Sequence, residues 1–407
     1  MSALVWLDYS ERERRKMLDV VDLFREKETR DELGIGSVRD VFADLLFPGT
    51  STIMTRARYF LLVPWTYLRL EKQRIPSAQM AVRARRAEID LVEAIEQSDD
   101  NLFNIGKVAR STLKRLPSSV YWQGLNTWGI RTFAGAQVQY NRSLDRYYQQ
   151  LSRHGGRTSE RDTEHDDLAS SNWHAAIISP PANFPTECSL KLMQREAEYL
   201  VERITLSPKT SGSLLAKLLE TRNTIGNVDF AWEHPIAADL PTKLRAELEH
   251  AHNFSELMHG APLLYNLILA EQAHRSDEVK VYRQRFNEWA KLVSDRLPTL
   301  AGWKKIDFWK IVDSANPRIT PATRDFVNNW WDLTLTGNAA HLCDNLVARS
   351  KIKERERRLK KNLARIDNPR AQELWAGDSG TGQLDFRWRI SQQLLRDIFL
   401  GLERTDA

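Results

Sequence analysis

The chain lacks the features that would place it outside the cytoplasm. Two cysteines, Cys188 and Cys343, are too few for a disulfide framework or a cysteine-based structural zinc site. The longest apolar stretch, residues 59–65, is interrupted by Pro64 and falls far short of the roughly 18 residues of a membrane span. Residues 1–16 carry acids and bases where a signal peptide needs an unbroken apolar region. We therefore expect a cytoplasmic protein with no membrane partner.

Recognised catalytic and cofactor-binding motifs are also lacking. The GIGS segment at residues 34–37 could cradle a phosphate, but it matches neither the dinucleotide fingerprint nor the phosphate-binding loop. The alternative is structural: Gly34 ends one helix and Gly36 permits the turn into the next. Residues 277–280 have the Asp-Glu-x-Lys letters of a nuclease site, yet they begin a helix rather than a strand pair. We therefore assign no catalytic residue and expect no cofactor.

One cluster has the residue types of a metal site. His252, Glu256 and His259 are spaced at i, i+4 and i+7, which places them on one helix face. The spacing is not the His-Glu-x-x-His of zinc peptidases, and no fourth ligand can be chosen from the sequence. Chance spacing in a helical protein with nine histidines is the simpler interpretation, so we assign no metal ligand.

Charge is unevenly distributed along the chain, although the net value is only +5. Residues 51–150 hold 15 basic and 8 acidic residues, and residues 349–407 hold 14 and 9. Between them, residues 151–250 hold 11 basic and 15 acidic residues. This pattern predicts a directed surface potential, provided that the two basic regions meet in the fold. Such a surface would attract nucleic acid or another phosphate-bearing partner.

Apolar residues recur at helical intervals along most of the chain, and no β-alternation or internal repeat of useful length is visible. In residues 77–97, for example, Leu91, Val92 and Ile95 share one face and charged residues cover the others. The sequence therefore predicts an all-α, multi-helical protein. Its helices are expected near residues 17–24, 38–47, 51–63, 77–97, 105–115, 118–129, 135–151, 187–204, 211–222, 241–258, 261–275, 277–297, 349–366 and 386–402.

A polar segment at residues 152–172 interrupts this pattern. It contains two glycines and many acids and bases, with Leu168 and Ala169 as its apolar residues. Such a composition is typical of a linker or a mobile loop. We therefore expect two helical subdomains, residues 1–151 and residues 173–407, joined by this segment.

The helix expected at residues 51–63 begins near Thr50, and Pro64 should end or kink it. Its first turns carry Arg56 and Arg58, which are two positions apart. On a helix they point about 200° apart, so both cannot lie on one exposed face. We predict that Arg58 is buried and hydrogen-bonded to an acid of the preceding helix, and that Arg56 points outward as a phosphate contact.

The helix expected at residues 349–366 is the most basic part of the chain. It contains nine Lys or Arg residues against two Glu, with only a thin apolar seam. A solvated helix is one interpretation, but so many like charges repel one another without a partner. Contact with nucleic-acid phosphates or with an acidic protein would relieve that repulsion.

Two other patterns are typical of nucleic-acid binding but also have structural explanations. The chain has 13 tryptophans, and Trp303 and Trp309 lie beside basic residues. They could stack on bases of a single strand or anchor the core. Residues 105–129 have the pattern of a helix–turn–helix, in which two short helices are joined by a turn. The short helix hairpins of all-α proteins share this pattern.

Three segments together resemble a known family. They are the Trp-Leu-Asp-Tyr-Ser run at residues 6–10, the FPGTSTIMTRARYF run at residues 47–60, and the Leu-Asp-Phe-Arg-Trp run at residues 384–388. The chain resembles, over nearly its full length, a bacterial family known only as a domain of unknown function. Its members tend to be encoded beside helicases and phospholipase-D-like nucleases in clusters that look like anti-phage defence islands. The resemblance implies a role in nucleic-acid-directed defence and transfers no catalytic residue.

We therefore predict a non-catalytic helical subunit of a bacterial anti-phage defence system. It would bind nucleic acid, DNA in preference to RNA, or a helicase or phospholipase-D-like nuclease subunit of the same system. The alternatives are a nuclease or nucleotide-processing enzyme with an unrecognised site, and a pure assembly scaffold. The residues predicted to contact nucleic acid or phosphate are Arg56, Arg83, Arg86, Lys304, Lys305, Arg355, Arg357, Arg358, Lys360 and Lys361.

Overall fold

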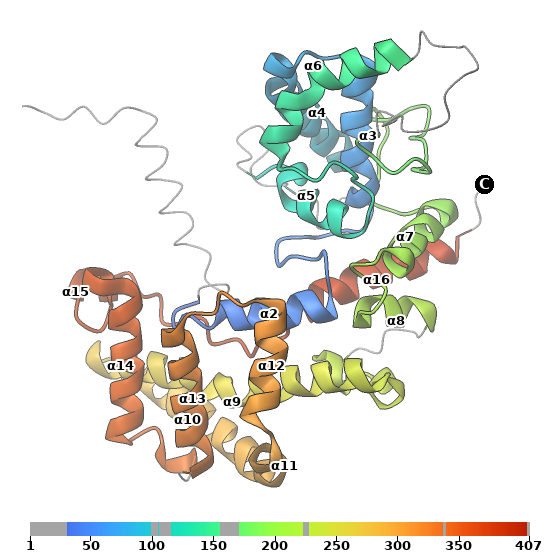
Figure 1. Cartoon of the computed structure of the whole chain (residues 1–407). Helices are drawn as coiled ribbons and strands as arrows, with labels where there is room; N and C mark the ends of the chain where they lie inside the picture. The colour runs from blue at the N-terminus through green and yellow to red at the C-terminus, as the bar shows by residue number, and fades with distance from the viewer. Residues whose placement is uncertain are drawn as a thin grey trace, which may run out of the picture. The chain divides into compact units, whose positions relative to one another are not determined.

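All regular secondary structure in the described part of the chain is helical, as the periodicity predicted. The computed structural model describes residues 31–98, 105, 115–154, 171–222, 228–336 and 339–404, and none of these residues belongs to a β-strand (Figure 1). An isolated bridge between Arg131 and Trp173 is the nearest approach to sheet structure among them. The helix expected at residues 17–24 and most of the one expected at residues 105–115 lie outside the described residues.

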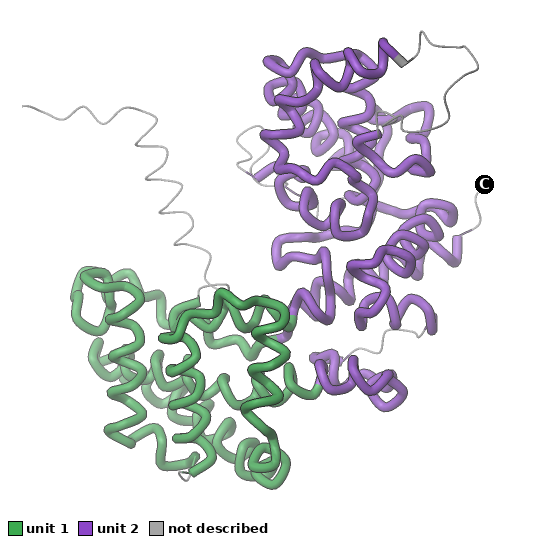
Figure 2. The backbone as a smooth tube through the Cα atoms, viewed as in Figure 1, with its two compact units in different colours: residues 1–42, 249–384 green, residues 43–248, 385–407 purple. Residues whose placement is uncertain are grey.

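The chain divides into two compact units, each built from two separate segments (Figure 2). Unit 1 comprises residues 1–42 and 249–384, and unit 2 comprises residues 43–248 and 385–407. The sequence predicted a division at residues 152–172, most of which lie outside the described residues. The unit boundaries fall inside α2 (Gly36–Leu46), inside α9 (Thr242–Gln272) and just before α16 (Trp388–Leu402).

Unit 1 is organised around aromatic side chains. Phe42 stacks on Phe254 and Phe308, with ring centroids 6.3 and 5.6 Å away, and Trp303 stacks on Trp331 at 3.6 Å. In the helix expected at residues 277–297, the side chains of Phe286, Trp289 and Val293 are buried. Besides parts of α2 and α9, the helices of unit 1 are α10 (Ser276–Asp295), α11 (Leu297–Gly302), α12 (Lys305–Ala315), α13 (Pro321–Thr336), α14 (Leu346–Lys360) and α15 (Pro369–Glu373), with short 3-10 turns η4 (Ala339–His341) and η5 (Lys361–Leu363).

Unit 2 contains a group of helices in which α4 packs against both α3 and α6, and α3 also packs against α5. The inward face of α4 is the predicted one, because Leu91, Val92 and Ile95 are buried. Beyond this group, α7 packs against α8 and α16. The elements of unit 2 are α3 (Tyr59–Lys72), α4 (Ser77–Glu96), α5 (Pro117–Thr127), α6 (Gln137–His154), α7 (Gln194–Leu206), α8 (Leu214–Glu220), η2 (Ala231–Glu233), η3 (Pro235–Asp239) and α16.

Two helices contain an internal proline, and in one of them Pro64 was expected to end or kink the helix. Helix α3 begins at Tyr59, later than predicted, and continues through Pro64 to Lys72. The helices predicted at residues 241–258 and 261–275 are one helix, α9, with Pro262 inside it. A proline costs about 3 kcal/mol inside a helix. Nearly all neighbouring side chains are buried in both helices, so tertiary packing outweighs this local cost.

The FPGTSTIMTRARYF segment is a structural joint within unit 2. The N–H groups of Thr55 and Arg56 donate to the hydroxyl of Tyr121, which donates back to the Arg56 carbonyl. The indole of Trp128 donates to the carbonyl of Pro48 at 3.0 Å and stacks on Phe60 with centroids 3.6 Å apart. These contacts hold residues 51–58 in turns rather than in the first turns of a helix.

Candidate nucleic-acid interface

Arg56 is buried, so the prediction that it points outward is wrong. Its Nε lies 3.0 and 2.9 Å from the two carboxylate oxygens of Asp397 in α16, and the N–H of Ala57 donates to the same carboxylate at 2.9 Å. The Arg56 side chain is 10% exposed and the Asp397 side chain 3%. Burial raises the pKa of Asp397, while the charge of Arg56 opposes that rise.

Arg58 is buried as predicted, but its partners lie elsewhere. Its guanidinium donates to the carboxylate of Glu196 in α7 at 2.6 Å and to the carbonyl of Ser189 at 3.0 Å. The sequence interpretation placed the partner acid in the preceding helix. The difference arises because α3 begins one residue after Arg58, so the arginine extends from a turn toward α7.

The basic helix predicted at residues 349–366 is shorter and less exposed than expected. Helix α14 ends at Lys360, and Arg355 in its third turn is 5% exposed. Arg355 donates to the carbonyls of Leu33, Gly34 and Ala322 at 2.7 to 3.0 Å. It therefore holds the segment before α2 against α14, and the prediction that it contacts nucleic acid is inconsistent with its burial.

Acids of unit 1 neutralise two more of these cations. Lys360 pairs with the buried carboxylate of Glu32 and lies 3.5 Å from that of Glu356. Arg357 forms a two-point pair with Asp367 at 2.7 and 2.8 Å, although both side chains are about half exposed, at 49% and 48%. Much of the expected self-repulsion in α14 is thus relieved within unit 1 and needs no external phosphate.

Of the predicted contacts in unit 1, Lys304, Arg358 and Lys361 are exposed. Lys305 differs from them because it pairs with Asp332 and lies over the Trp331 ring. The exposed cations of unit 1 therefore remain candidate phosphate contacts. They do not form the continuous exposed basic helix that the sequence predicted.

Trp303 and Trp309 make packing and hydrogen-bond contacts within unit 1. The Trp303 indole donates to His250 at 2.7 Å, and its ring stacks on Trp331 as described above. Trp309 is 7% exposed, and its indole donates to Asn328 at 2.9 Å. Of the two interpretations left open by the sequence, these contacts favour core anchoring over base stacking.

The histidine cluster on α9 is held by an arginine. Arg296 donates to His252 at 2.8 Å and to Asn253 at 2.9 Å, and it pairs with Glu256. His259 contacts a different part of the unit, because its Nε2 donates to the carbonyl oxygen of Thr381 at 3.1 Å. Among the described residues, no three His, Cys, Asp or Glu side chains are grouped as metal ligands.

Arg83 and Arg86 on α4 are exposed as predicted. The inward face of this helix contains Met80, Ala84 and Leu91, so Arg83 and Arg86 lie on the solvent side. Within the described residues, no acidic side chain lies at salt-bridge distance from either arginine. Arg56, which the sequence also predicted to contact phosphate, differs from them because it pairs with Asp397.

Further cations lie near the start of α4 and were missed by the sequence analysis. The Ser77 hydroxyl donates to the Arg142 carbonyl, and Arg74 donates to the hydroxyl of Ser152, so the turn between α3 and α4 lies against α6. The end of α3, the start of α4 and α6 therefore lie together, and each of these helices carries exposed cations. We call these exposed residues the α3–α6 cations: Arg69, Lys72, Arg74, Arg83, Arg86, Arg142, Arg146 and Arg153.

Two carboxylates of the same helices are buried beneath this surface. Glu88 accepts hydrogen bonds from the Ser118 N–H and hydroxyl, both at 2.7 Å, and burial raises its pKa to about 7. Glu71 accepts from Tyr140 and from the indole of Trp173, and burial raises its pKa as well. Their charge is removed from the surface, so the exposed part of these helices is more basic than a residue count suggests.

No described helix is both long and apolar enough to cross a membrane. Residues 1–400 match the sequence model of a family of unknown function (DUF6361), and the chain belongs to this family. No curated protein and no solved structure matches the chain.

Proposed function

We propose that this DUF6361 protein is a non-catalytic helical subunit that binds nucleic acid through the α3–α6 cations. The observation that carries the proposal is the contrast between two sets of basic residues. Arg83 and Arg86 are exposed and form no ion pair with a described residue, whereas Arg355 and Lys360 of α14 are committed to partners inside unit 1. Exposed cations without acidic partners can release the counterions of a phosphate backbone, and buried paired cations cannot.

The arrangement of the helices supports contact with several phosphates at once. The contacts of Ser77 with Arg142 and of Arg74 with Ser152 bring the end of α3 and the start of α4 against α6. Of the eight α3–α6 cations, seven are arginines, whose planar guanidinium groups suit two-point contact with phosphate. Contacts of this kind fix the position of a protein on nucleic acid without reading its sequence.

Two charge-matched triple variants test the proposal. The first, Arg83→Ala/Arg86→Ala/Arg142→Ala, neutralises three α3–α6 cations, and the second, Lys304→Ala/Arg358→Ala/Lys361→Asn, neutralises three exposed cations of unit 1. Asn replaces Lys361 because that residue has a φ of 50°, which Asn tolerates better than Ala. Binding is measured by fluorescence anisotropy with duplex DNA, single-stranded DNA and RNA of equal length.

The first variant should lose at least about tenfold in affinity at physiological salt, and the second should bind as the unaltered protein does. The affinities for the three probes then show whether the protein prefers DNA or RNA. If only the second variant loses affinity, the surface of unit 1 is the contact. If the unaltered protein binds none of the probes, the chain is not a nucleic-acid-binding subunit.

We also propose that this subunit acts together with a helicase or a phospholipase-D-like nuclease in bacterial anti-phage defence. The support is the resemblance carried by the three sequence segments described above. Co-expression with the neighbouring gene products followed by affinity purification tests it. A stable complex is expected, and a chain that purifies alone under conditions in which the neighbouring proteins are soluble would contradict it.

A second candidate function is a nuclease with an unrecognised site. The purified chain, incubated with labelled DNA and Mg²⁺ or Mn²⁺, distinguishes the two proposals. We expect no cleavage above that of a mock purification. Metal-dependent cleavage that survives further purification steps would favour the enzyme.

A further inference from the structure

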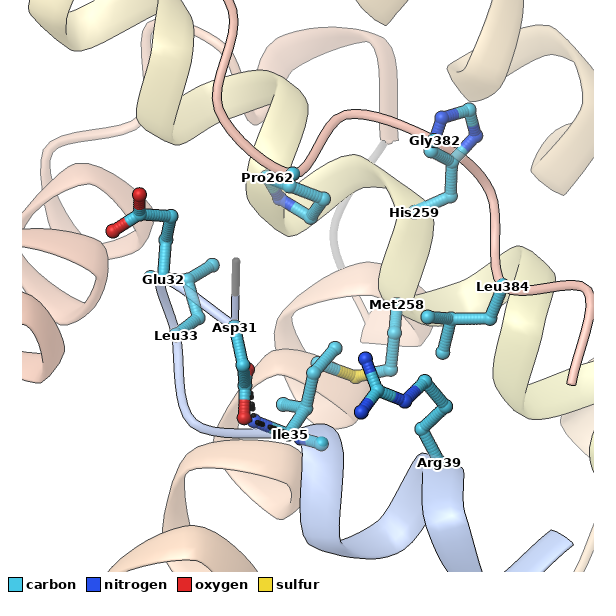
Figure 3. A pocket seen from close by; sticks show the side chains of 12 residues that line it. Asp31, Glu32, Leu33, Ile35, Arg39, Met258, His259, Pro262, Gly382 and Leu384 are labelled. Carbon is cyan, nitrogen blue, oxygen red and sulfur yellow. Dashed lines mark hydrogen bonds between the residues drawn. The ribbon is translucent and has the colours of Figure 1, made fainter. Parts of the chain in front are cut away.

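Unit 1 contains a cavity of about 70 Å³ where the start of α2, the middle of α9 and the loop at residues 380–384 meet (Figure 3). This volume holds several water molecules or one small branched group. Most of its wall is apolar, with side chains from all three segments. The apolar lining residues are Leu33, Ile35, Met258, Pro262 and Leu384.

The two acids beside the cavity already have hydrogen-bond or ion-pair partners. The Asp31 carboxylate accepts from the N–H groups of Ile35 and Gly36 at 2.7 and 2.6 Å, so it caps the start of α2. Glu32 pairs with Arg365 at 2.8 Å and with Lys360. Neither carboxylate is therefore available to bind a cationic ligand, and both disfavour an anion with two charges.

Arg39 is the cation that faces this cavity. Its Nε and one terminal nitrogen donate to Asp40 at 3.1 and 3.0 Å, and within the described residues its second terminal nitrogen has no partner. Figure 3 shows the guanidinium directed toward the side chain of Met258. The Asp40 side chain is 48% exposed, so this surface pair contributes little and does not compete strongly with a ligand.

The loop over the cavity is held by its carbonyl groups. The carbonyl of Ser379 accepts from Asn266 at 2.9 Å, and that of Thr381 accepts from Arg285 at 3.1 Å. In a trans peptide the N–H points opposite to the preceding carbonyl. The N–H groups of Gly380 and Gly382 are therefore turned away from these partners, and within the described residues neither donates a hydrogen bond.

We propose that this cavity binds a carboxylate attached to a small aliphatic group, as in a free branched acid or the C-terminal residue of a peptide. The guanidinium of Arg39 binds the carboxylate, and the apolar wall receives the aliphatic group. A single negative charge suits the site better than a phosphate dianion because Asp31 and Glu32 lie nearby. The inference goes beyond nucleic-acid binding and does not depend on the α3–α6 cations.

N-acetyl-L-leucine and a tetrapeptide ending in leucine serve as probes, each compared with its C-terminal amide. Binding is measured by saturation-transfer NMR on the full chain. We expect the acids to bind with a dissociation constant on the order of 1 mM and the amides to give no signal. A stronger signal from the tetrapeptide identifies a peptide C-terminus as the ligand, and an equal signal identifies a free small acid.

Two pairs of variants separate binding from folding. Arg39→Gln should abolish the signal, and Arg358→Gln, which changes the same charge on an exposed residue of the unit, should not. A Cβ at Gly382 meets no atom within 4 Å, so substitutions there are compatible with the fold. Gly382→Asp should repel the carboxylate and abolish binding, whereas Gly382→Ala should retain it. Equal signals from acids and amides, or signals unchanged in Arg39→Gln and Gly382→Asp, would overturn the proposal.

Discussion

Arg56 and Asp397 are 341 positions apart in the sequence and form a buried ion pair within unit 2. The same carboxylate accepts the N–H of Ala57, so α16 is tied both to the side chain and to the backbone of the segment before α3. Arg58 ties that segment to α7 through Glu196. Two arginines that are separated by one residue and resemble ligand contacts in the sequence therefore connect three parts of one unit.

Removal of one partner of this pair should strongly destabilise unit 2. We expect Asp397→Ala to lower the free energy of unfolding by about 3 to 5 kcal/mol, because Arg56 would keep a buried charge without a counterion. The double variant Arg56→Met/Asp397→Leu should recover much of that loss. Urea denaturation followed by circular dichroism measures both. Equal stability of the single variant and the unaltered protein would contradict the burial of the pair.

Glu88 should make stability depend on pH. Burial raises its pKa from 4.5 to about 7, so the folded state binds a proton more tightly than the unfolded state. Its contribution is present in full below pH 4.5 and is lost as the pH rises toward 7, by up to about 3 kcal/mol in total. Glu88→Gln does not titrate, and its unfolding free energy should fall less between pH 5 and about 7.5 than that of the unaltered protein. Parallel curves for the two proteins would show that Glu88 is not the titrating group.

Arg355 should behave as a structural residue. We expect Arg355→Ala to destabilise the protein by about 2 to 4 kcal/mol, since several buried carbonyl groups lose their donor. Arg358→Ala, three positions later and exposed, should change stability by no more than about 0.5 kcal/mol. Thermal unfolding compares the two. A destabilising effect of Arg358→Ala that equals that of Arg355→Ala would be inconsistent with their different burial.

Salt dependence should report how many α3–α6 cations contact phosphate. Each lost contact with duplex DNA should reduce the slope of log affinity against log salt concentration by about 0.9. Arg83→Ala/Arg86→Ala should therefore reduce the slope by about 2. Anisotropy titrations between 50 and 200 mM salt give the slopes. A lower affinity with an unchanged slope would instead indicate an indirect effect on the fold.

Local spacing was enough to predict the helical class and some side-chain environments. The inward face of α4 follows from helical periodicity, and the burial of Arg58 follows from the impossibility of exposing two arginines on one face. These predictions depend on residues close in sequence. Predictions that required distant partners were less successful, because nothing near Arg56 or Arg355 indicates Asp397 or the carbonyls of Leu33 and Gly34.

The candidate interface illustrates the same limit. Arg83 and Arg86 were selected from a local cluster, and the structure adds Arg142 and Arg146, which lie more than one helix away in the sequence. Their proximity depends on contacts between α4 and α6, such as that of Ser77 with the Arg142 carbonyl. Conversely, the charge of residues 349–366 is conspicuous in the sequence, but its neutralisation by Glu32 and Asp367 is visible only in the fold.

The discontinuous construction of unit 2 has a consequence for the order of synthesis. Residues 385–407 complete unit 2, but the ribosome makes them after residues 249–384 of unit 1. Until Asp397 has been synthesised, Arg56 lacks its counterion, and residues 249–384 of unit 1 are translated during that time. Unit 2 therefore completes its folding after the last segment of unit 1 has emerged. For the same reason, a fragment cut at the polar segment near residue 160 would separate Arg58 from Glu196 and could not complete unit 2.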